Sequence, residues 1–87
     1  MDVLERIQKA FANLSKNQKK VAEYIGRDGA MASFDSVRQL ARKAGVSESS
    51  VVRLAQALGY AGYPELRRQL QEEFKKKWAA PEGSSGP

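Results

Sequence analysis

The chain has 87 residues, with 15 Lys and Arg against 10 Asp and Glu, and it contains neither cysteine nor histidine. Without cysteine there is no disulfide, thiolate nucleophile or cysteine zinc site, and without histidine the commonest general base and metal ligand are missing. A chain of this length buries only about 60% of the surface that its unfolded form exposes, which disfavours a deep enzyme cleft. Because no nucleophile and base can be paired, we expect no enzyme activity, no metal site and no cofactor.

The net charge of +5 favours polyanionic partners such as nucleic acid. Apolar runs are only a few residues long, and residues 1–12 mix acidic and basic groups where a signal peptide needs an apolar core. We therefore expect no membrane segment and a cytoplasmic, bacterial-type soluble domain.

Apolar residues recur at three- and four-residue spacing along most of the chain, without strand-like alternation of useful length. The expected fold class is therefore all-α, with about five helices. A first helix is predicted over residues 2–12. A second helix follows the N-cap Ser15, whose capping box is completed by Gln18, and it is expected to end at Gly26 or Gly29.

Two further helices are predicted from their N-terminal caps. Ser36 and Gln39 repeat the capping box and open a third helix. Ser47 caps a fourth helix over residues 47–58, which Gly59 is expected to end.

The segment "GYAGYPEL" predicts a turn through Gly62 and a fifth helix that starts with Pro64 at its first position and runs to about Lys77. The last nine residues, "AAPEGSSGP", are small and polar, and cannot bury enough apolar surface to offset the entropy of ordering them. We expect residues 1–78 to form the domain and residues 79–87 to be a flexible linker or an added tail.

Only Gly45 and Val46 separate the third helix from the cap of the fourth, so the sequence predicts two helices held at a fixed angle. Gly45 can take the left-handed conformation, and Val46 can pair with Val51 as a hydrophobic staple. The apolar positions are spaced as in a helix-turn-helix: Leu40, Ala41, Ala44, Val46, Val51 and Leu54. The residues that face outward on the fourth helix are Ser47, Glu48, Ser49, Val52, Arg53 and Gln56. An ordinary αα-corner with a solvated face is the alternative interpretation.

The outward face suits the major groove of double-stranded DNA. Arginine can bond guanine bidentately, valine can contact the thymine methyl, glutamate can accept from cytosine, and serine can donate or accept. Between Lys16 and Arg53 there are eight Lys or Arg and four Asp or Glu, an excess that can engage phosphates, with Lys19 as one candidate contact. Ser36 and Ser47 can serve both as caps and as phosphate contacts at helix N-termini.

Four aromatic residues near the C-terminal end allow a different interpretation, as stacking platforms for single-stranded bases. They lie beside apolar helix positions, which favours core or a dimer surface instead. These residues are Tyr60, Tyr63, Phe74 and Trp78.

Two segments, "LSKNQKKVAEYI" and "SVRQLARKAGVSESSVVRLAQALGYAGYPELRRQL", resemble the N-terminal DNA-binding domain of RpiR-type bacterial transcription regulators. The resemblance covers roughly residues 14–70. The run from "AGVS" through "VVRLAQALGY" to "GYPEL" is far more specific than a bare helix-turn-helix. The motif positions that it places on the recognition helix are Ser47, Ser49, Ser50, Val52 and Arg53. Those that it implies for structural turns are Gly45, Gly59 and Gly62.

The resemblance implies a homeodomain-like helix-turn-helix bundle that places residues 47–58 in the major groove and controls genes of sugar or phosphosugar metabolism. In that family a sugar isomerase-like domain follows, so a phosphosugar effector is expected to act only through a C-terminal domain absent from this chain. A homodimer is expected for the full-length protein. The competing interpretation is a protein–protein interaction domain that docks a partner helix without binding DNA.

Overall fold

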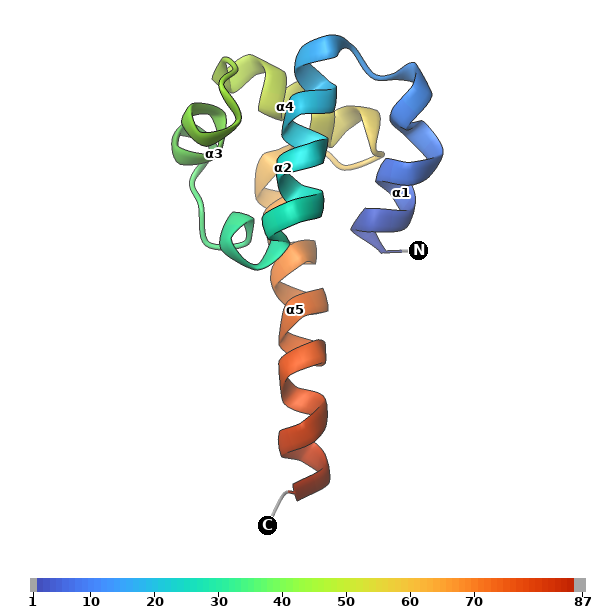
Figure 1. Cartoon of the computed structure of the whole chain (residues 1–87), viewed down its shortest axis with the longest axis vertical. Coiled ribbons are helices and arrows are strands. Elements are labelled where there is room, and N and C mark those ends of the chain that lie inside the picture. Colours follow the sequence, from blue (N-terminus) through green and yellow to red (C-terminus); the bar gives the residue numbers. More distant parts are fainter. Residues whose placement is uncertain (1, 86–87) are drawn as a thin grey trace.

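The computed structural model describes the backbone of residues 2–85 and the side chains of residues 2–75 (Figure 1). The elements in this part of the chain are α1 (Val3–Ala10), the 3-10 turn η1 (Phe11–Asn13), α2 (Lys16–Ala32), α3 (Val37–Ala44), α4 (Glu48–Ala57) and α5 (Tyr63–Ser85). No strand occurs in residues 2–85, and the predicted all-α class with five α-helices is confirmed. Within the same residues, none of the helices combines the length and the apolar character that crossing a bilayer requires.

In Figure 1, α2 stands at the centre, with α1 on one side, α3 on the other, and α4 and the start of α5 behind it. Buried side chains from all five α-helices meet in one core. Its largest fully buried members are Ile25, Leu40, Leu54, Leu66 and Leu70. Each of these helices turns one apolar stripe inward, as the three- and four-residue spacing predicts.

The three aromatic residues of the C-terminal half whose side chains the structure describes pack as core. Tyr60 and Tyr63 are buried, and Phe74 is half-buried against the core, so the base-stacking interpretation finds no support at these three positions. The side chain of Trp78 lies outside the described side chains.

Two capping boxes start α2 and α3, as predicted. The Ser15 hydroxyl accepts from the Gln18 backbone N–H at 3.2 Å, and the Gln18 side chain accepts from the Ser15 N–H at 2.9 Å. Ser36 and Gln39 make the same reciprocal pair at 3.1 and 2.9 Å. Each box satisfies two backbone donors that a helix start otherwise leaves without partners.

The predicted end of α2 at Gly26 or Gly29 is wrong. The helix continues to Ala32, through a kink at Asp28 where φ is −135° and ψ is 50°. Gly29 is needed for packing rather than termination, because a Cβ there would lie 2.6 Å from the ring of Phe74 on α5. The glycine therefore lets α5 approach α2 closely.

The fifth helix also differs from its prediction. It begins at Tyr63, so Pro64 is its second residue, and its backbone continues to Ser85 rather than ending near Lys77. The interpretation of residues 79–87 as a linker or tail stays a prediction, and residues 86–87 lie outside the described residues.

Three side chains of α5 hold the connection between α2 and α3 through its backbone carbonyls. The Tyr63 hydroxyl lies 3.2 Å from the carbonyl oxygen of Ala32 and 2.7 Å from that of Asp35. Arg67 donates to the carbonyls of Ser33 and Phe34, at 3.2 and 3.4 Å. Gln71 donates to the Ser33 carbonyl at 2.8 Å. Because these side chains are spaced four residues apart on one helix face, α5 reaches every carbonyl from residue 32 to residue 35. The Ala32 carbonyl also accepts from the Asp35 backbone N–H at 3.1 Å.

Helix α1 is fastened to the bundle at two points. The Glu73 carboxylate of α5 accepts from the Val3 backbone N–H at 2.9 Å, and Arg6 Nη1 donates to the Leu58 carbonyl at 2.8 Å. The Arg6 guanidinium also lies 4.8 Å from the ring centroid of Tyr60, a cation–π distance. A cation at the last carbonyls of a helix is favourable, so Arg6 stabilises the C-terminal end of α4.

Replacing Tyr63 by Phe is expected to change how stability depends on pH. Burial, and then the Asp35 carboxylate, raise the pKa of the Tyr63 hydroxyl to about 12, whereas an unfolded tyrosine titrates near about 10. The folded state therefore holds this proton more tightly, and the resulting stability is complete below about pH 10 and lost between about pH 10 and pH 12. From pH 8 to pH 11, the wild-type free energy of unfolding should fall by about 1–1.5 kcal/mol more than that of Tyr63→Phe.

Urea unfolding of both proteins at the two pH values measures this difference. Lysines also titrate in this pH range, but they do so in both proteins, so their effect cancels in the comparison. At pH 8 the variant should itself be less stable by about 1–3 kcal/mol, because the buried hydrogen bond from the Tyr63 hydroxyl to the Asp35 carbonyl is lost. An identical pH dependence in the two proteins would contradict this account of Tyr63.

Candidate nucleic-acid interface

The turn between α3 and α4 is a Schellman motif. The Val46 N–H donates to the Ala41 carbonyl at 2.9 Å and the Gly45 N–H to the Arg42 carbonyl at 3.2 Å. Gly45 has φ +75° and ψ 37°, the left-handed conformation that the sequence predicted. Val46 packs against the core at the corner, so the two helices meet at a defined angle.

Ser47 begins α4 as its N-cap, as predicted. Its hydroxyl accepts from the Ser50 backbone N–H at 3.3 Å and lies 3.1 Å from the Ser50 hydroxyl. Val51 is fully buried and Val46 is half-buried against the same core, the arrangement expected for a hydrophobic staple.

A second Schellman motif ends α4. The Tyr60 N–H donates to the Ala55 carbonyl and the Gly59 N–H to the Gln56 carbonyl, both at 3.0 Å, and Gly59 has φ +95°. Gly59 thus ends the helix as predicted. Gly62 lies in the turn before α5 without a left-handed φ, and its carbonyl accepts from the Leu66 N–H at 3.3 Å.

Between its two glycine turns, α4 presents a polar face to solvent. The exposed side chains of this face are Glu48, Ser49, Arg53 and Gln56, with Val52 half-buried among them. Val51, Leu54 and Ala55 point the other way, into the core. The structure thus gathers most of the predicted recognition residues on one accessible surface, which we call the α4 face and define by those five residues.

Ser50 and Lys19 lie differently from the other predicted contacts. Ser50 is buried, and its hydroxyl pairs with Ser47, so it lies outside the α4 face. Lys19 is half-buried in α2, with Nζ 5.4 Å from the ring centroid of Phe11. Ser36 is exposed at the start of α3, where its hydroxyl caps that helix.

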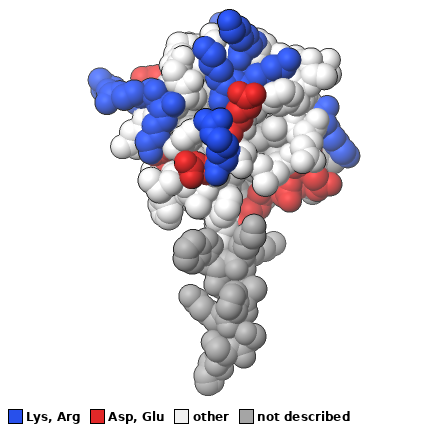
Figure 2. All heavy atoms as spheres, in the orientation of Figure 1, with Lys and Arg blue, Asp and Glu red and all other residues white. Residues whose placement is uncertain are grey.

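Positive charge lies beside the α4 face, on two neighbouring helices. Figure 2 shows Lys and Arg gathered where α2 begins and over α3, whereas a cluster of Asp and Glu lies at the lower edge on the side of α1. The exposed cations of α2 and α3 include Lys16, Lys20, Arg38 and Arg42. The sequence contains a signal for these exposed cations in addition to the overall charge excess. Each of them lies opposite the apolar stripe of its helix, which predicts that its side chain faces solvent.

Lys43, on the same helix as Arg42, is committed to an internal contact. Its Nζ lies 3.0 Å from the Asp35 carboxylate, which is buried and lies 3.5 Å from the Tyr24 hydroxyl. The hydrogen bond to Asp35 raises the pKa of Lys43. Lys43 thus neutralises a buried carboxylate. No group of three or more acidic side chains that could hold a metal ion occurs among the described residues.

This arrangement of α2, α3 and α4 can be compared with known proteins. A family model described as the helix-turn-helix domain of the rpiR family matches residues 1–77. The chain belongs to the rpiR family of helix-turn-helix domains. The resemblance read from the sequence is therefore confirmed, and this rpiR-family domain is a helix-turn-helix domain of the kind found in transcriptional regulators.

Two curated relatives are 41% identical to the rpiR-family domain. The HTH-type transcriptional regulator YfhH of Escherichia coli strain K12 matches over 87 residues, all of this chain and 30% of its own length. The HTH-type transcriptional regulator HexR of Pseudomonas aeruginosa strain PAO1 matches over 73 residues, 84% of this chain and 26% of its own length. The chain thus spans under a third of each of these relatives.

Solved structures share the fold of this rpiR-family domain. The N-terminal domain of the transcriptional regulator ybbH from Bacillus subtilis has a TM-score of 0.74 at 28% identity, covering 78% of this chain and 83% of that one. The Vibrio vulnificus NanR protein, complexed with ManNAc-6P, has a TM-score of 0.81 at 30% identity, covering 97% of this chain and 32% of that one.

Replacing Gly45 by Val is expected to lower the free energy of unfolding by about 1–2 kcal/mol, because a β-branched residue is strained in the left-handed region. A Cβ at Gly45 would meet no atom within 4 Å, so the cost arises from the backbone alone. Gly26→Ala is the matched control, since it also meets no atom within 4 Å but lies in α2. That change should stabilise the domain by about 0.5–1 kcal/mol. Thermal unfolding measures both, and an unchanged melting temperature for Gly45→Val would remove this account of the turn.

Proposed function

We propose that this chain is a sequence-specific double-stranded DNA-binding domain that inserts α4 into the major groove. The observation that supports this proposal best is the α4 face itself. It is polar, exposed, and carried by a helix whose two ends are both fixed by glycine turns. A rigid helix with short polar side chains fits a groove about 12 Å wide, and it can bring those side chains to base edges.

Arg53 is the residue we assign to base reading. It lies in the middle of the α4 face, is exposed, and forms no ion pair with the described side chains. Its planar guanidinium can donate to both O6 and N7 of guanine. Ser49 and Gln56 lie four and three residues from Arg53 on the helix, and Val52 is spaced three and four residues from Ser49 and Gln56. Serine and glutamine can hydrogen-bond bases, and valine can contact a thymine methyl.

Phosphate contacts are assigned to the cations beside the α4 face. Arg38 and Arg42 of α3 and Lys16 and Lys20 of α2 are exposed. Lysine and arginine that neutralise phosphates release condensed counterions, which supplies affinity without sequence preference. Lys19 and the helix starts at Ser36 and Ser47 are further candidates; for Lys19, a phosphate contact would compete with its position over Phe11.

The regulated genes and the effector are assigned from the relatives. NanR was solved in complex with ManNAc-6P, a phosphosugar, and this chain aligns with only 32% of NanR. We assign the chain to a regulator of sugar or phosphosugar metabolism genes, whose phosphosugar effector binds outside these 87 residues and whose full-length form is a homodimer.

The competing function is a protein interaction domain that uses the same bundle without DNA. Selection of bound duplexes from a random pool separates the two. A DNA-binding domain enriches one motif, and a domain that serves only protein partners enriches none because its DNA association is weak and lost in salt.

Arg53→Ala is expected to weaken binding to the selected duplex by about 1–3 kcal/mol and to relax the preference at one base pair. Arg53→Lys is the matched control, because it keeps the charge but lacks the bidentate fork. It should lose the base preference while keeping affinity for random DNA. Titration of selected and random duplexes at one salt concentration measures both effects, and equal losses on the two duplexes for Arg53→Ala would count against base reading.

Arg42→Ala is expected to weaken binding equally on selected and random duplexes, because a phosphate contact is independent of sequence. The slope of log affinity against log salt should fall in magnitude by about one. Lys9→Ala removes an exposed cation from α1, on the opposite side of α2 from α3, and should leave the slope unchanged (Figure 1). Titrations at four or more salt concentrations give the slopes, and equal slopes for Arg42→Ala and wild type would exclude the phosphate contact.

A further inference from the structure

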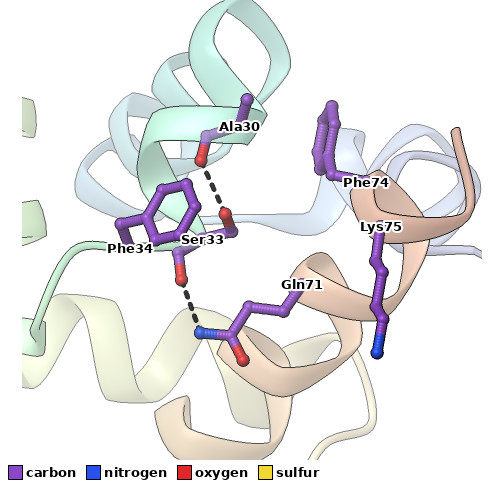
Figure 3. Close-up of a pocket in the computed structure, with 6 residues that line it drawn as sticks. All are labelled: Ala30, Ser33, Phe34, Gln71, Phe74 and Lys75. Carbon is purple, nitrogen blue, oxygen red and sulfur yellow. Dashed lines mark hydrogen bonds between the residues drawn. The ribbon is translucent and has the colours of Figure 1, made fainter. Parts of the chain in front are cut away.

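The helix-turn-helix formed by α3 and α4 is attached to two other helices, one near each of its ends. Figure 3 shows the first attachment, where Gln71 of α5 donates to the Ser33 carbonyl directly before the connection to α3. The second attachment is at the C-terminal end of α4, where the Arg6 guanidinium of α1 donates to the Leu58 carbonyl. A helix outside the helix-turn-helix thus contacts the helix that carries the α4 face.

Arg6 contacts three consecutive residues where α4 ends. Its Nη1 donates to the Leu58 carbonyl at 2.8 Å, and its guanidinium carbon lies 4.8 Å from the ring centroid of Tyr60. A Cβ at Gly59 would lie 2.7 Å from the same Nη1, so the glycine leaves free the space that the guanidinium occupies. The Arg6 Nε is buried. The guanidinium therefore faces the end of α4 rather than solvent.

The Leu58 carbonyl depends on Arg6 for its hydrogen bond. The Schellman motif at this end of α4 satisfies the carbonyls of Ala55 and Gln56. Among the described residues, the donor to the Leu58 carbonyl is Arg6 alone. Hydrogen bonds from a charged donor are stronger than those between neutral groups, so Arg6 adds a firm attachment to the glycine turn.

The helix that presents Arg6 is itself fixed. Val3 and Ile7, one turn apart on α1, are buried in the core. The Glu73 carboxylate of α5 accepts from the Val3 N–H at 2.9 Å. Core packing and this hydrogen bond therefore set where Arg6 stands, and its contact restrains the end of α4.

A small movement of α4 is enough to affect base reading. The helix has ten residues, which corresponds to about 15 Å at 1.5 Å per residue. If its start stays fixed at Gly45, a tilt of about 5° moves its far end by about 1.3 Å. Binding groups must be held within about 0.5 Å of their productive positions. On the α4 face, Gln56 and then Arg53 lie nearest to the end that Arg6 holds.

We propose that Arg6 is a positioning residue for DNA recognition. It holds the C-terminal end of α4 in the direction that lets Arg53 and Gln56 reach base edges, and it does not itself touch DNA. The inference rests on the proposed function, because it requires that α4 reads the major groove. Through Arg6, α1 controls how sharply the domain discriminates between sequences.

Hydrogen exchange of the free domain tests the attachment without DNA. Arg6→Met keeps an unbranched side chain and removes the donor and the charge. It should speed the exchange of the Gly59 and Tyr60 amides about tenfold, because their Schellman hydrogen bonds open more often when the end of α4 is released. The Gly45 and Val46 amides, at the other end of α4, should exchange at the wild-type rate.

Titration of the selected and the random duplexes tests the effect on recognition. Arg6→Met should lower the ratio of the two affinities about fivefold, which is part of what a bidentate base contact supplies. The salt slope should stay unchanged, because Arg6 contacts no phosphate. Arg6→Lys keeps a cation that can donate to the Leu58 carbonyl, and it should restore most of the ratio. Lys9→Met is the matched control, since it removes an exposed cation from the same helix and should behave as wild type.

The Arg53→Ala background separates positioning from a general loss of stability. Without Arg53 there is less for a tilted α4 to misplace, so Arg6→Met should then lower the ratio of affinities by less than about twofold. A smaller folded fraction weakens binding to both duplexes equally and leaves their ratio unchanged. An equal loss of the ratio with and without Arg53 would mean that Arg6 does not act through the reading residues.

Two other results count against the inference. One is the same ratio of affinities for Arg6→Met and Lys9→Met while the wild-type domain prefers the selected duplex, and this result leaves the proposed function intact. The other is an equal rise in exchange at both ends of α4, which would indicate general destabilisation instead of a released C-terminal end. A wild-type domain without any duplex preference would remove the proposed function itself, and the role of Arg6 in recognition with it.

Discussion

Three side chains of α5 hold the backbone carbonyls in the connection between α2 and α3. Tyr63, Arg67 and Gln71 donate from one face of that helix to the backbone between residues 32 and 35. The bond from Tyr63 to the Asp35 carbonyl is buried. A buried carbonyl without a donor costs about 1–3 kcal/mol, so this bond favours one position for the connection. Since α3 begins directly after it, the same bonds fix where α3, and through it α4, stands relative to α5.

A Schellman motif with a left-handed glycine lies at each end of α4. Gly45 and Gly59 each take a positive φ, each closes a Schellman motif, and each is followed by an apolar residue that packs on the core. Arg6 adds a cation at the second of these turns, where the helix dipole is negative. Both ends of α4 are fixed and its apolar side is buried. The side chains of the α4 face are not needed for packing, so they are available to contact a partner.

The features that the sequence predicted well depend on neighbours in the chain. The capping boxes at Ser15 and Ser36, and the turns at Gly45 and Gly59, each rest on residues within one turn of one another, so local chemistry determines them. The end of α2 could not be predicted in this way. Gly29 resembles a terminator in sequence, and its true role depends on Phe74, which approaches it only in the folded chain.

The candidate site also contains residues whose positions were predictable from local spacing and residues whose positions depend on contacts in the folded chain. Helical spacing placed Glu48, Ser49, Val52, Arg53 and Gln56 on one face, which the structure reproduces. The burial of Ser50 follows from its pairing with the Ser47 hydroxyl, and the position of Lys19 follows from Phe11. The hydrogen bonds from α5 side chains to the α2–α3 connection could not be predicted from the sequence. Their acceptors are backbone carbonyls, which every residue has, so no residue type marks them.

Helix α5 runs without interruption from Tyr63 to Ser85, a length of about 35 Å at 1.5 Å per residue. Its first turns are hydrogen-bonded to the α2–α3 connection. A change in the direction of α5 is therefore transmitted to α3 and α4. A tilt of about 10° at the far end of such a rod displaces that end by about 6 Å and reorients the whole helix-turn-helix by the same angle. Whatever holds the distal end of α5 therefore sets the direction in which α4 points, and in the proposed DNA-binding homodimer it would set the spacing between the two α4 helices.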